Sequence, residues 1–261
     1  MSITVLLMGD MHTGSMCGLT PDGWIVGQKR DRFFSKLQEE MWNDYLEILD
    51  GFGEVDYVVV NGDVIDGNGK RSGGTELITT NLFEQVDMAV NVLGRIKCSK
   101  KMYFTYGTPY HTSDGDGNDF DSLVAKEMNG VIDDQLQLNF GGLLMNVRHD
   151  TRGSSVPYSR STAITKEHVW DQLYAIKGQT KPADVHIRSH VHFYTICGDA
   201  DWYGFTLPAL QASNTKYGAR RCSGITDWGM CKFTIDNGNL AGWDVQLRRL
   251  EPSRTNIINL N

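Results

Sequence analysis

The sequence has few cysteines, and none of them form a recognisable pair. Five cysteines occur in 261 residues, and no two of them are spaced as CxxC. Because a disulfide framework needs an even set at regular spacings, we expect reduced thiols and a cytoplasmic protein. The chain also lacks an apolar run of the ~20 residues that span a bilayer. Its first residues have neither the basic region nor the long apolar stretch of a signal peptide.

An excess of positive charge is missing as well. The chain has 25 Lys and Arg against 32 Asp and Glu, a formal net charge of -7. An acidic chain gains little from non-specific attraction to nucleic acid or anionic lipid. The sequence shows no zinc finger, basic helix or alternation of aromatic and basic residues. A phosphate-bearing substrate would therefore need local cations, either Arg and Lys or metal.

Repeats, low-complexity tracts and proline-rich linkers are absent, which favours one domain over residues 1–261. The first half alternates predicted strands and helices, at 3–9, 30–50, 56–61, 75–97 and 102–106. The second half predicts a hairpin around Gly141-Gly142, a helix over 165–177 and several short strands. This order is typical of an α/β domain whose early strands are buried on both faces, followed by a mostly β half.

Residues that can bind metal or phosphate follow the predicted strands. The stretch LLMGDMHTG (6–14) ends an apolar run with a carboxylate and an imidazole one residue apart. The full set is Asp10, His12, Asp63, His111, His149, His190 and His192. Any one of these is well explained as a hydrogen-bonded residue at a strand end. Together they indicate a site, because ligands of α/β sheets bind beyond the carboxyl ends of the strands.

The chemistry of this set favours transition metals. Mixed Asp and His ligands suit Mn, Fe, Zn or Co better than an all-oxygen calcium or magnesium site. Two cations sharing one carboxylate can clamp a phosphoryl group and ionise a water. Residues two apart in a strand face the same side, so we expect His190 and His192 to serve one site together. His186 is interpreted as a structural residue, with a supporting place at this site as the alternative because it faces the same side of the strand.

Five motifs, in order, resemble those of a known family. The segments GDMHTG (9–14), NGD (61–63), GTPYH (107–111), RHD (148–150) and SHVH (189–192) resemble the calcineurin-like metallophosphoesterase series GDxHxG, GDxxDxG, GNH, a lone His and GHxH. A weaker similarity of the segments at 207–221 and 225–236 points to phage- or prophage-encoded members. The resemblance implies an α/β (α+β) fold, a four-layer β-sandwich flanked by helices with the metal site at one rim.

The resemblance also implies a role for each residue. Asp10, His12 and His192 would hold one divalent metal ion, Asp63 would bridge, and His149 and His190 would hold a second. Manganese is the favoured metal, with iron, zinc, cobalt and nickel as alternatives. His111 would be catalytic, stabilising the phosphate or protonating the leaving oxygen. The implied activity is hydrolysis of a phosphodiester or phosphomonoester, nucleotide or nucleic acid favoured, by a metal-activated water.

The family's GNH motif is altered in this chain. The Asn that ligates the second metal is missing from GTPYH, so either the Thr108 hydroxyl or a water takes its place. Asp66 matches the second acidic residue of GDxxDxG, and we interpret it as orienting a ligand or as a solvated turn residue.

Nearby cations are further candidates for binding phosphate. Arg148 and Arg152 either clamp phosphate or form surface ion pairs. Lys216, Arg220 and Arg221 are interpreted as surface residues.

Two rival functions remain open. The first is a catalytically weakened, metal-binding scaffold of the same fold, which the lost Asn favours. A decayed site should, however, have lost more than one ligand. The second is a metal-dependent hydrolase of non-phosphate esters, which a comparison of phosphate and carboxylate esters would distinguish. The sequence leaves the biological substrate and the oligomeric state undetermined.

Overall fold

The computed structural model describes residues 2–24, 36–70, 73–154, 156–213 and 225–250. Its larger sheet has six strands in the order β11-β10-β1-β2-β3-β4. These are β1 (Ser2–Met8), β2 (Val55–Asn61), β3 (Cys98–Thr105), β4 (Val131–Asp133), β10 (Trp228–Asp236) and β11 (Asn239–Arg248). Strands β1 to β4 are parallel, whereas β10 and β11 add an antiparallel edge. The carboxyl ends of the parallel strands therefore meet at one rim.

The second sheet has five strands in the order β5-β6-β7-β9-β8. Its strands are β5 (Gln135–Phe140), β6 (Leu143–Arg148), β7 (Val185–Arg188), β8 (Thr195–Gly198) and β9 (Tyr203–Thr206). Strands β5 and β6 pair antiparallel across Gly141 and Gly142, which confirms the predicted hairpin. Strand β7 runs parallel to β6, so its carboxyl end comes to the same end of the sheet as that of β6.

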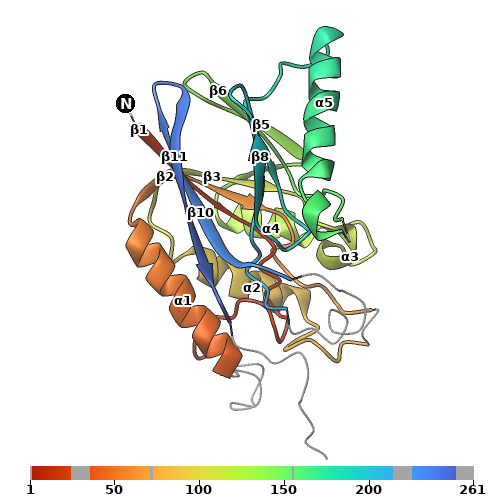
Figure 1. Ribbon diagram of the computed structural model, residues 1–261. Coiled ribbons are helices and arrows are strands. Elements are labelled where there is room, and N and C mark those ends of the chain that lie inside the picture. The colour runs from red at the N-terminus through yellow and green to blue at the C-terminus, as the bar shows by residue number, and fades with distance from the viewer. Residues whose placement is uncertain (1, 25–35, 71–72, 155, 214–224, 251–261) are drawn as a thin grey trace, which may run out of the picture.

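Helices cover the outer faces of both sheets. The main ones are α1 (Lys36–Phe52), α2 (Leu82–Leu93), α4 (Phe120–Glu127) and α5 (Thr162–Ile176), with short turns α3 (Pro109–Thr112) and η1 (Pro157–Ser159). Figure 1 shows α1 and α2 on one side of the molecule and α5 on the opposite side. The expected four layers of helix, sheet, sheet and helix are confirmed; the single domain over 1–261 stays a prediction.

Several helix boundaries differ from the sequence prediction. The helix expected over 75–97 begins only at Leu82, because the Asn81 side chain accepts hydrogen bonds from the backbone N–H groups of Phe83 and Glu84 and so caps it there. Of the helix expected over 30–50, residues 30–35 lie outside the described part of the chain. The described helix α1 runs from Lys36 to Phe52, two residues beyond the expected end.

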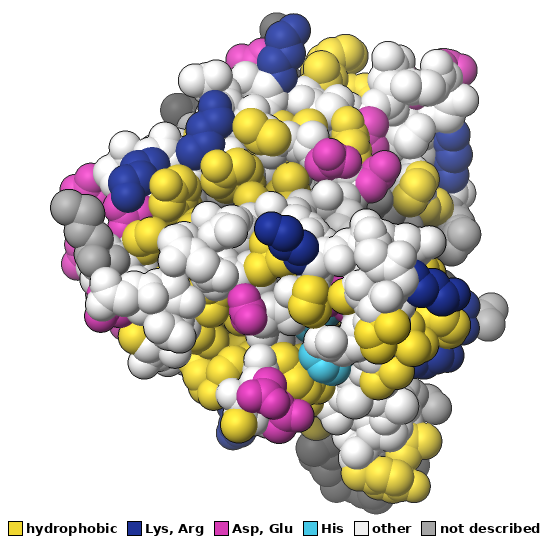
Figure 2. Space-filling view, turned by 90° about the horizontal axis from the view of Figure 1, so that it is seen from above, with side chains coloured by type: hydrophobic (Ala, Val, Ile, Leu, Met, Phe, Trp, Pro, Cys, Tyr) yellow, Lys and Arg dark blue, Asp and Glu magenta, His cyan; other side chains and the backbone are white. Residues whose placement is uncertain are grey.

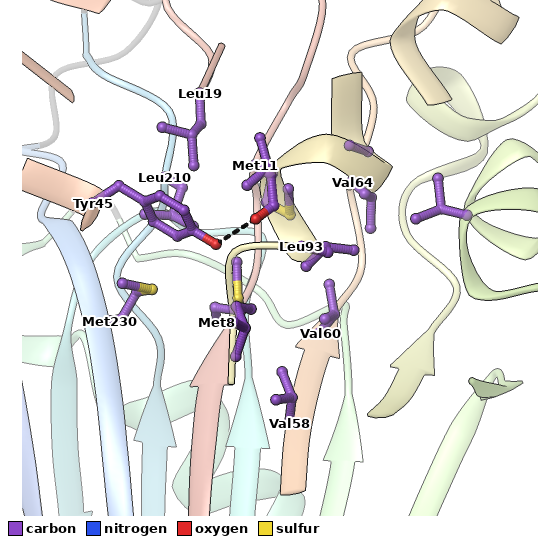
Figure 3. Close-up of a cluster of buried hydrophobic side chains, with 14 of the residues drawn as sticks. Met8, Met11, Leu19, Tyr45, Val58, Val60, Val64, Leu93, Leu210 and Met230 are labelled. Carbon is purple, nitrogen blue, oxygen red and sulfur yellow. Dashed lines mark hydrogen bonds between the residues drawn. The ribbon is translucent and has the colours of Figure 1, made fainter. Parts of the chain in front are cut away.

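The alternation of side chains along β1 builds two separate cores. Leu6 and Met8 face the helices α1 and α2, whereas Val5 and Leu7 face the second sheet. Figure 3 shows the helix-side core, where Met8, Val58 and Val60 of the sheet lie below Tyr45 and Leu93. Because both faces of β1 are buried, its apolar run is continuous and its register is strongly specified.

Two further expectations concern the surroundings of the protein. In the described part of the chain, Cys17, Cys98, Cys197 and Cys231 are free thiols, in agreement with the expectation of reduced cysteines. None of the described helices combines the length and the hydropathy that a bilayer crossing requires.

Removal of the Tyr45 hydroxyl would test a hydrogen bond in the helix-side core. This hydroxyl is fully buried and donates to the Val92 carbonyl at 2.9 Å, the contact drawn in Figure 3. We expect Tyr45→Phe to lower the free energy of unfolding by about 1 kcal/mol, the usual worth of a neutral hydrogen bond. Urea denaturation would measure it. The control is Tyr158→Phe, at a side chain that is 93% exposed, where a comparable loss would contradict the assignment.

Candidate metal centre

Six of the predicted ligands meet at the rim in linked clusters. Asp10, His12 and His192 form one group in which a ligand atom of each lies within 4.8 Å of the others. Asp63, His149 and His190 form a second such group. A third, made of His12, Asp63 and His111, joins the two. Asp63 thus lies between the groups, 3.9 Å from His12 and 3.1 Å from His149, as a bridging carboxylate would.

The backbone at these residues has an uncommon conformation. Seven described non-glycine residues have positive φ, and five of them are the predicted ligands Asp10, His12, Asp63, His190 and His192. A left-handed conformation costs roughly 1–2 kcal/mol per residue. Backbone strain of this kind clusters at functional sites, where the surrounding structure maintains it. The concentration at one rim therefore indicates a built site.

The left-handed residues do not follow the side-chain alternation of a strand. Strand β7 already ends at Arg188, so the expectation that His190 and His192 share one face of a strand is wrong. The two side chains go to different groups, one to each. This separation agrees with the roles that the family resemblance implies.

Three imidazoles are oriented in the same way. The Nδ1 of His12 contacts Asp66 Oδ1 at 2.9 Å, and that of His149 contacts the Asn61 carbonyl at 2.7 Å. The Nδ1 of His111 contacts the Asp66 carbonyl at 2.9 Å. Each acceptor is an oxygen, so each Nδ1 carries the proton and donates. The Nε2 atoms are thereby left for a ligand, as in most metal-binding histidines.

The buried polar atoms at the centre fit a cation. His12 Nε2 is buried and has no hydrogen-bond partner among the described residues. It lies 3.9 Å from the buried Asp10 Oδ1, which is itself 3.1 Å from His192 Nε2. Leaving a buried nitrogen unpaired costs several kcal/mol in an apolar setting, whereas a divalent cation would accept electron pairs from all three atoms. The donor set therefore fits the metals that its chemistry favours.

Electrostatics couple the carboxylates to the imidazoles. Burial alone would raise the pKa of Asp10 and Asp63, but the adjacent His192 and His149 hold both below the ordinary value. Conversely, burial would lower the pKa of His149, yet Asp63 raises it to about 10. The pKa of His192 is also raised, by Asp10. Without a cation, these groups pair as carboxylates with imidazolium ions.

The Thr108 hydroxyl lies at the second group of ligands. Its Oγ1 is 3.2 Å from His190 Nδ1, 3.4 Å from His149 Nε2 and 3.2 Å from Asp63 Oδ2. The backbone N–H of Thr108 also donates to Asp63 Oδ1 at 2.5 Å. A hydroxyl thus faces the second group of ligands, although its coordination of a metal stays a prediction.

Asp66 supports the centre and does not behave as a solvated turn residue. Its carboxylate accepts from His12 and its carbonyl from His111, so one residue orients both imidazoles. Gln85 in turn fixes the Asp66 loop, since its Oε1 accepts from the backbone N–H groups of Asp66 and Gly67. The interpretation of Asp66 as a residue that orients a ligand agrees with this geometry.

Three supporting residues have no counterpart in the sequence prediction. The Asn61 amide donates to Ser189 Oγ at 2.8 Å and accepts from Thr105 Oγ1 at 2.7 Å, tying the two sheets together. The buried Asp121 carboxylate accepts from the backbone N–H groups of Val64 and Gly107. Burial and the nearby Asp63 raise the pKa of Asp121 well above its ordinary value. The third is Gln85, and the signal for it was a polar residue on the apolar face of a helix.

The remaining candidates belong to none of the three ligand groups. His186 contacts His168 at 3.2 Å and Trp202, on the side of the second sheet that α5 covers, which agrees with its interpretation as a structural residue and not with the alternative of a supporting place at the centre. Arg148 pairs with Glu167 at 3.1 Å, and Arg148 and Arg152 both line a cavity beside α5. Lys216, Arg220 and Arg221 lie outside the described residues.

Comparisons with known proteins give similarities of fold. No family model matches the sequence, and no curated protein matches it. Among solved structures, an archaeal phosphodiesterase is similar with 13% identity over 94% of this chain and 100% of its own, at a TM-score of 0.48. The phosphoesterase YfcE from E. coli has 11% identity, covers 93% and 98%, and scores 0.45. Wild-type Vps29 from Entamoeba histolytica, complexed with zinc, has 13% identity, covers 95% and 100%, and scores 0.44.

These three structures share the fold class of metallophosphoesterases, but the similarity is too low to support an activity. The case for the site therefore rests on its own geometry. A phage or prophage origin finds no support in these comparisons.

A substitution at Gly62 would test how closely the second ligand group (Asp63, His149 and His190) is packed. The φ of Gly62 is +73°, and an added Cβ would lie 2.4 Å from His149 Nδ1. We expect Gly62→Ala to displace His149 and reduce the number of bound metal ions, measured by elemental analysis of the purified protein. The matched control is Gly53→Ala, with φ +68° and nothing within 4 Å of its Cβ. Gly53→Ala should lose a similar amount of folding stability to its left-handed backbone and still bind the metal ions. Equal metal content in both variants would contradict the prediction.

Metal binding should release protons. Because the pKa of His149 is about 10, its imidazole is protonated at pH 7 before a cation binds. The pKa of His192 is raised as well, so His192 keeps its proton to a higher pH than an ordinary histidine. A metal that takes their nitrogens must displace those protons, so affinity should strengthen as pH rises from 6 to 8. Calorimetric titrations in two buffers of different ionisation enthalpy would count the protons. His149→Gln should lower the count, and His168→Gln, remote from the centre, should leave it unchanged.

Proposed function

We propose that the protein is a metal-dependent phosphoesterase. The observation that carries the proposal is the shared position of Asp63 between two ligand groups, next to the buried carboxylate of Asp10 and the buried, unpartnered Nε2 of His12, which together suit a cation. Asp10, His12 and His192 would hold one cation, and His149 and His190 a second, with Asp63 common to both. The complete set of carboxylate and imidazole donors supports two sites.

Two divalent cations bound there would clamp a phosphoryl group and generate a hydroxide nucleophile near neutral pH. Mn²⁺ is the favoured ion, and Fe, Zn, Co or Ni suit the same nitrogen and oxygen donors. The residues of the chain supply the geometry. Asp66 and the Asn61 carbonyl fix the imidazoles, and Thr108 holds both oxygens of Asp63.

His111 is the candidate for proton transfer. Its side chain is 23% exposed, in contrast to the buried His12, which it contacts edge to face at 4.6 Å between ring centroids. The Asp66 carbonyl holds Nδ1, so Nε2 is the atom that can reach a substrate. In its protonated form that atom can donate to a phosphate oxygen or to the leaving oxygen.

A phosphodiester of a nucleotide or nucleic acid is the favoured substrate. Figure 2 shows Lys and Arg side chains standing separately among hydrophobic and acidic ones on the face seen from above. Together with the net charge of -7, this distribution argues against long-range, non-specific attraction to duplex DNA. Recognition would then depend on a few cations close to the centre.

The second candidate function is a metal-binding scaffold with weakened catalysis. The observation that favours it is Thr108, because a neutral hydroxyl replaces the stronger amide oxygen at the second group. Against it stands the retention of all six Asp and His donors. The two functions differ in turnover and agree in metal content.

The test is hydrolysis of bis-p-nitrophenyl phosphate after chelation and re-addition of Mn²⁺. We expect Mn²⁺ to restore turnover, and Asp63→Asn to lower it by more than the about 10- to 100-fold that loss of a supporting partner costs. His111→Ala should lower it about 100-fold or more for an alkyl diester, whose leaving group needs a proton. The loss should be smaller for the nitrophenyl diester, whose leaving group departs as an anion.

The control is His168→Gln, which replaces a histidine remote from the centre and should keep full turnover. If the wild type binds two equivalents of metal and hydrolyses neither mono- nor diesters with any of the five metals, the scaffold replaces the enzyme. Hydrolysis of carboxylate esters in place of phosphate esters would instead support the non-phosphate hydrolase.

A further inference from the structure

A cavity of about 180 Å³ lies immediately beside the candidate metal centre. It is lined by Arg148, Asp150, Thr151, Arg152, Ala163, Lys166, Glu167 and Trp170. Asp150 follows the predicted ligand His149 directly and approaches His190 Nε2 to 4.0 Å. Arg152 is three residues from His149, so their Cα atoms are at most about 11 Å apart. A molecule held at the centre can therefore extend into this cavity.

The cavity is cationic in an acidic protein. Among the described residues that line it, three carry positive charge and two are carboxylates. One of those carboxylates, Glu167, already pairs with neighbouring cations. Its oxygens pair with Arg148 at 3.1 Å and with the buried Arg188 behind the cavity, and also accept from Thr151. The lining therefore has three cations against two acids, where the whole chain carries -7.

Arg148 is held in the wall of the cavity by Glu167. Glu167 holds one end of its guanidinium, while the Nε atom is buried without a hydrogen-bond partner among the described residues. A guanidinium fixed in this way binds phosphate with little loss of conformational freedom. The volume is below the 300 Å³ or so of pockets that enclose a drug-sized ligand. It suits a single phosphate group, with the rest of the ligand outside.

Aromatic side chains continue from the cavity along α5. Lys166, Trp170 and Tyr174 recur at intervals of four residues and so share one stripe of the helix. Trp170 is 51% exposed and Tyr174 47% exposed, and their rings lie 6.2 Å apart. The sequence shows no local alternation of aromatic and basic residues, but the helical period brings them together. Exposed aromatic rings beside cations are the platform on which single-stranded nucleic acids stack their bases.

We propose that this cavity and the α5 stripe form a subsite for the nucleotide next to the scissile bond of a single-stranded oligonucleotide. Arg148, Arg152 and Lys166 bind its phosphate, and its base stacks on Trp170. The subsite selects oligonucleotides over phosphomonoesters and small diesters. The inference rests on the proposed phosphoesterase function for its purpose, but the binding itself can be measured separately from catalysis.

The first test is binding of a fluorescent phosphorothioate oligothymidylate, which resists hydrolysis, to the full-length protein as purified. We expect Trp170→Ala to weaken binding about 5- to 150-fold, the range for one stacked base. Trp170→Phe should recover part of it. The double variant Arg152→Ala/Lys166→Ala should reduce the slope of log affinity against log salt concentration by about 1.4. This is the change expected when two contacts to the phosphates of a single strand are lost, at about 0.7 for each. Lys177→Ala, one residue beyond α5 and outside the cavity, is the matched control.

The second test is the ratio of oligothymidylate to bis-p-nitrophenyl phosphate hydrolysis, which Trp170→Ala should lower. Wild-type turnover of the small diester without oligonucleotide binding would overturn the subsite and leave the proposed function standing. Binding that depends on Trp170 in a protein inert on every ester would support the subsite and reject the phosphoesterase.

Two other occupants of the α5 stripe would also overturn the inference. A wild-type dimer that Trp170→Ala converts to a monomer, seen by light scattering, would make the stripe an interface between copies. Co-sedimentation with phosphatidylserine vesicles, abolished by the same substitution, would make it a lipid contact.

Discussion

The centre depends on the way the loops after β1 and β2 stay paired beyond the end of the sheet. The backbone N–H groups of Asp10 and His12 donate to the carbonyls of Gly62 and Asp63, at 3.0 and 3.1 Å. These bonds continue the ladder between the two strands while the ligands themselves adopt left-handed conformations. Because the ladder holds the strained backbone, the side chains of Asp10, His12 and Asp63 all turn into one space. The remaining ligands only need to approach that space from the second sheet.

Much of the fold could be predicted from the sequence, because buried parallel strands have continuous apolar runs and helices have apolar residues at intervals of three and four. The hairpin at Gly141-Gly142 and the order of the strands followed from local signals. The start of α2 did not, since apolar residues at Leu77 and Ile78 continue the pattern through a segment that packs without being helical. The cap at Asn81, and not hydrophobicity, determines where that helix begins.

The ligand set could also be predicted, but not its geometry. The motifs placed Asp10, His12, Asp63, His149, His190 and His192 in one site, and the structure brings them together. Strand alternation failed for the pair in SHVH because β7 ends before them. The contact of Asn61 with Ser189 spans 128 residues, and no local pattern can indicate such a contact. Among the groups that orient the histidines, Asp66 was foreseen from its motif, whereas the Asn61 carbonyl emerged only from the structure, as did the aromatic stripe of α5.

The two ligand groups draw on both sheets of the sandwich. Asp10, His12 and Asp63 follow strands of the larger sheet, whereas His149, His190 and His192 follow strands of the smaller one. A pair of cations bound between them would link the two sheets. Because the cations bind only when both sheets are in place, their binding free energy would stabilise the packing of one sheet on the other. With metal bound, the rim would then be the most rigid part of the molecule. Without metal, its adjacent buried charges would make it the first part to unfold locally.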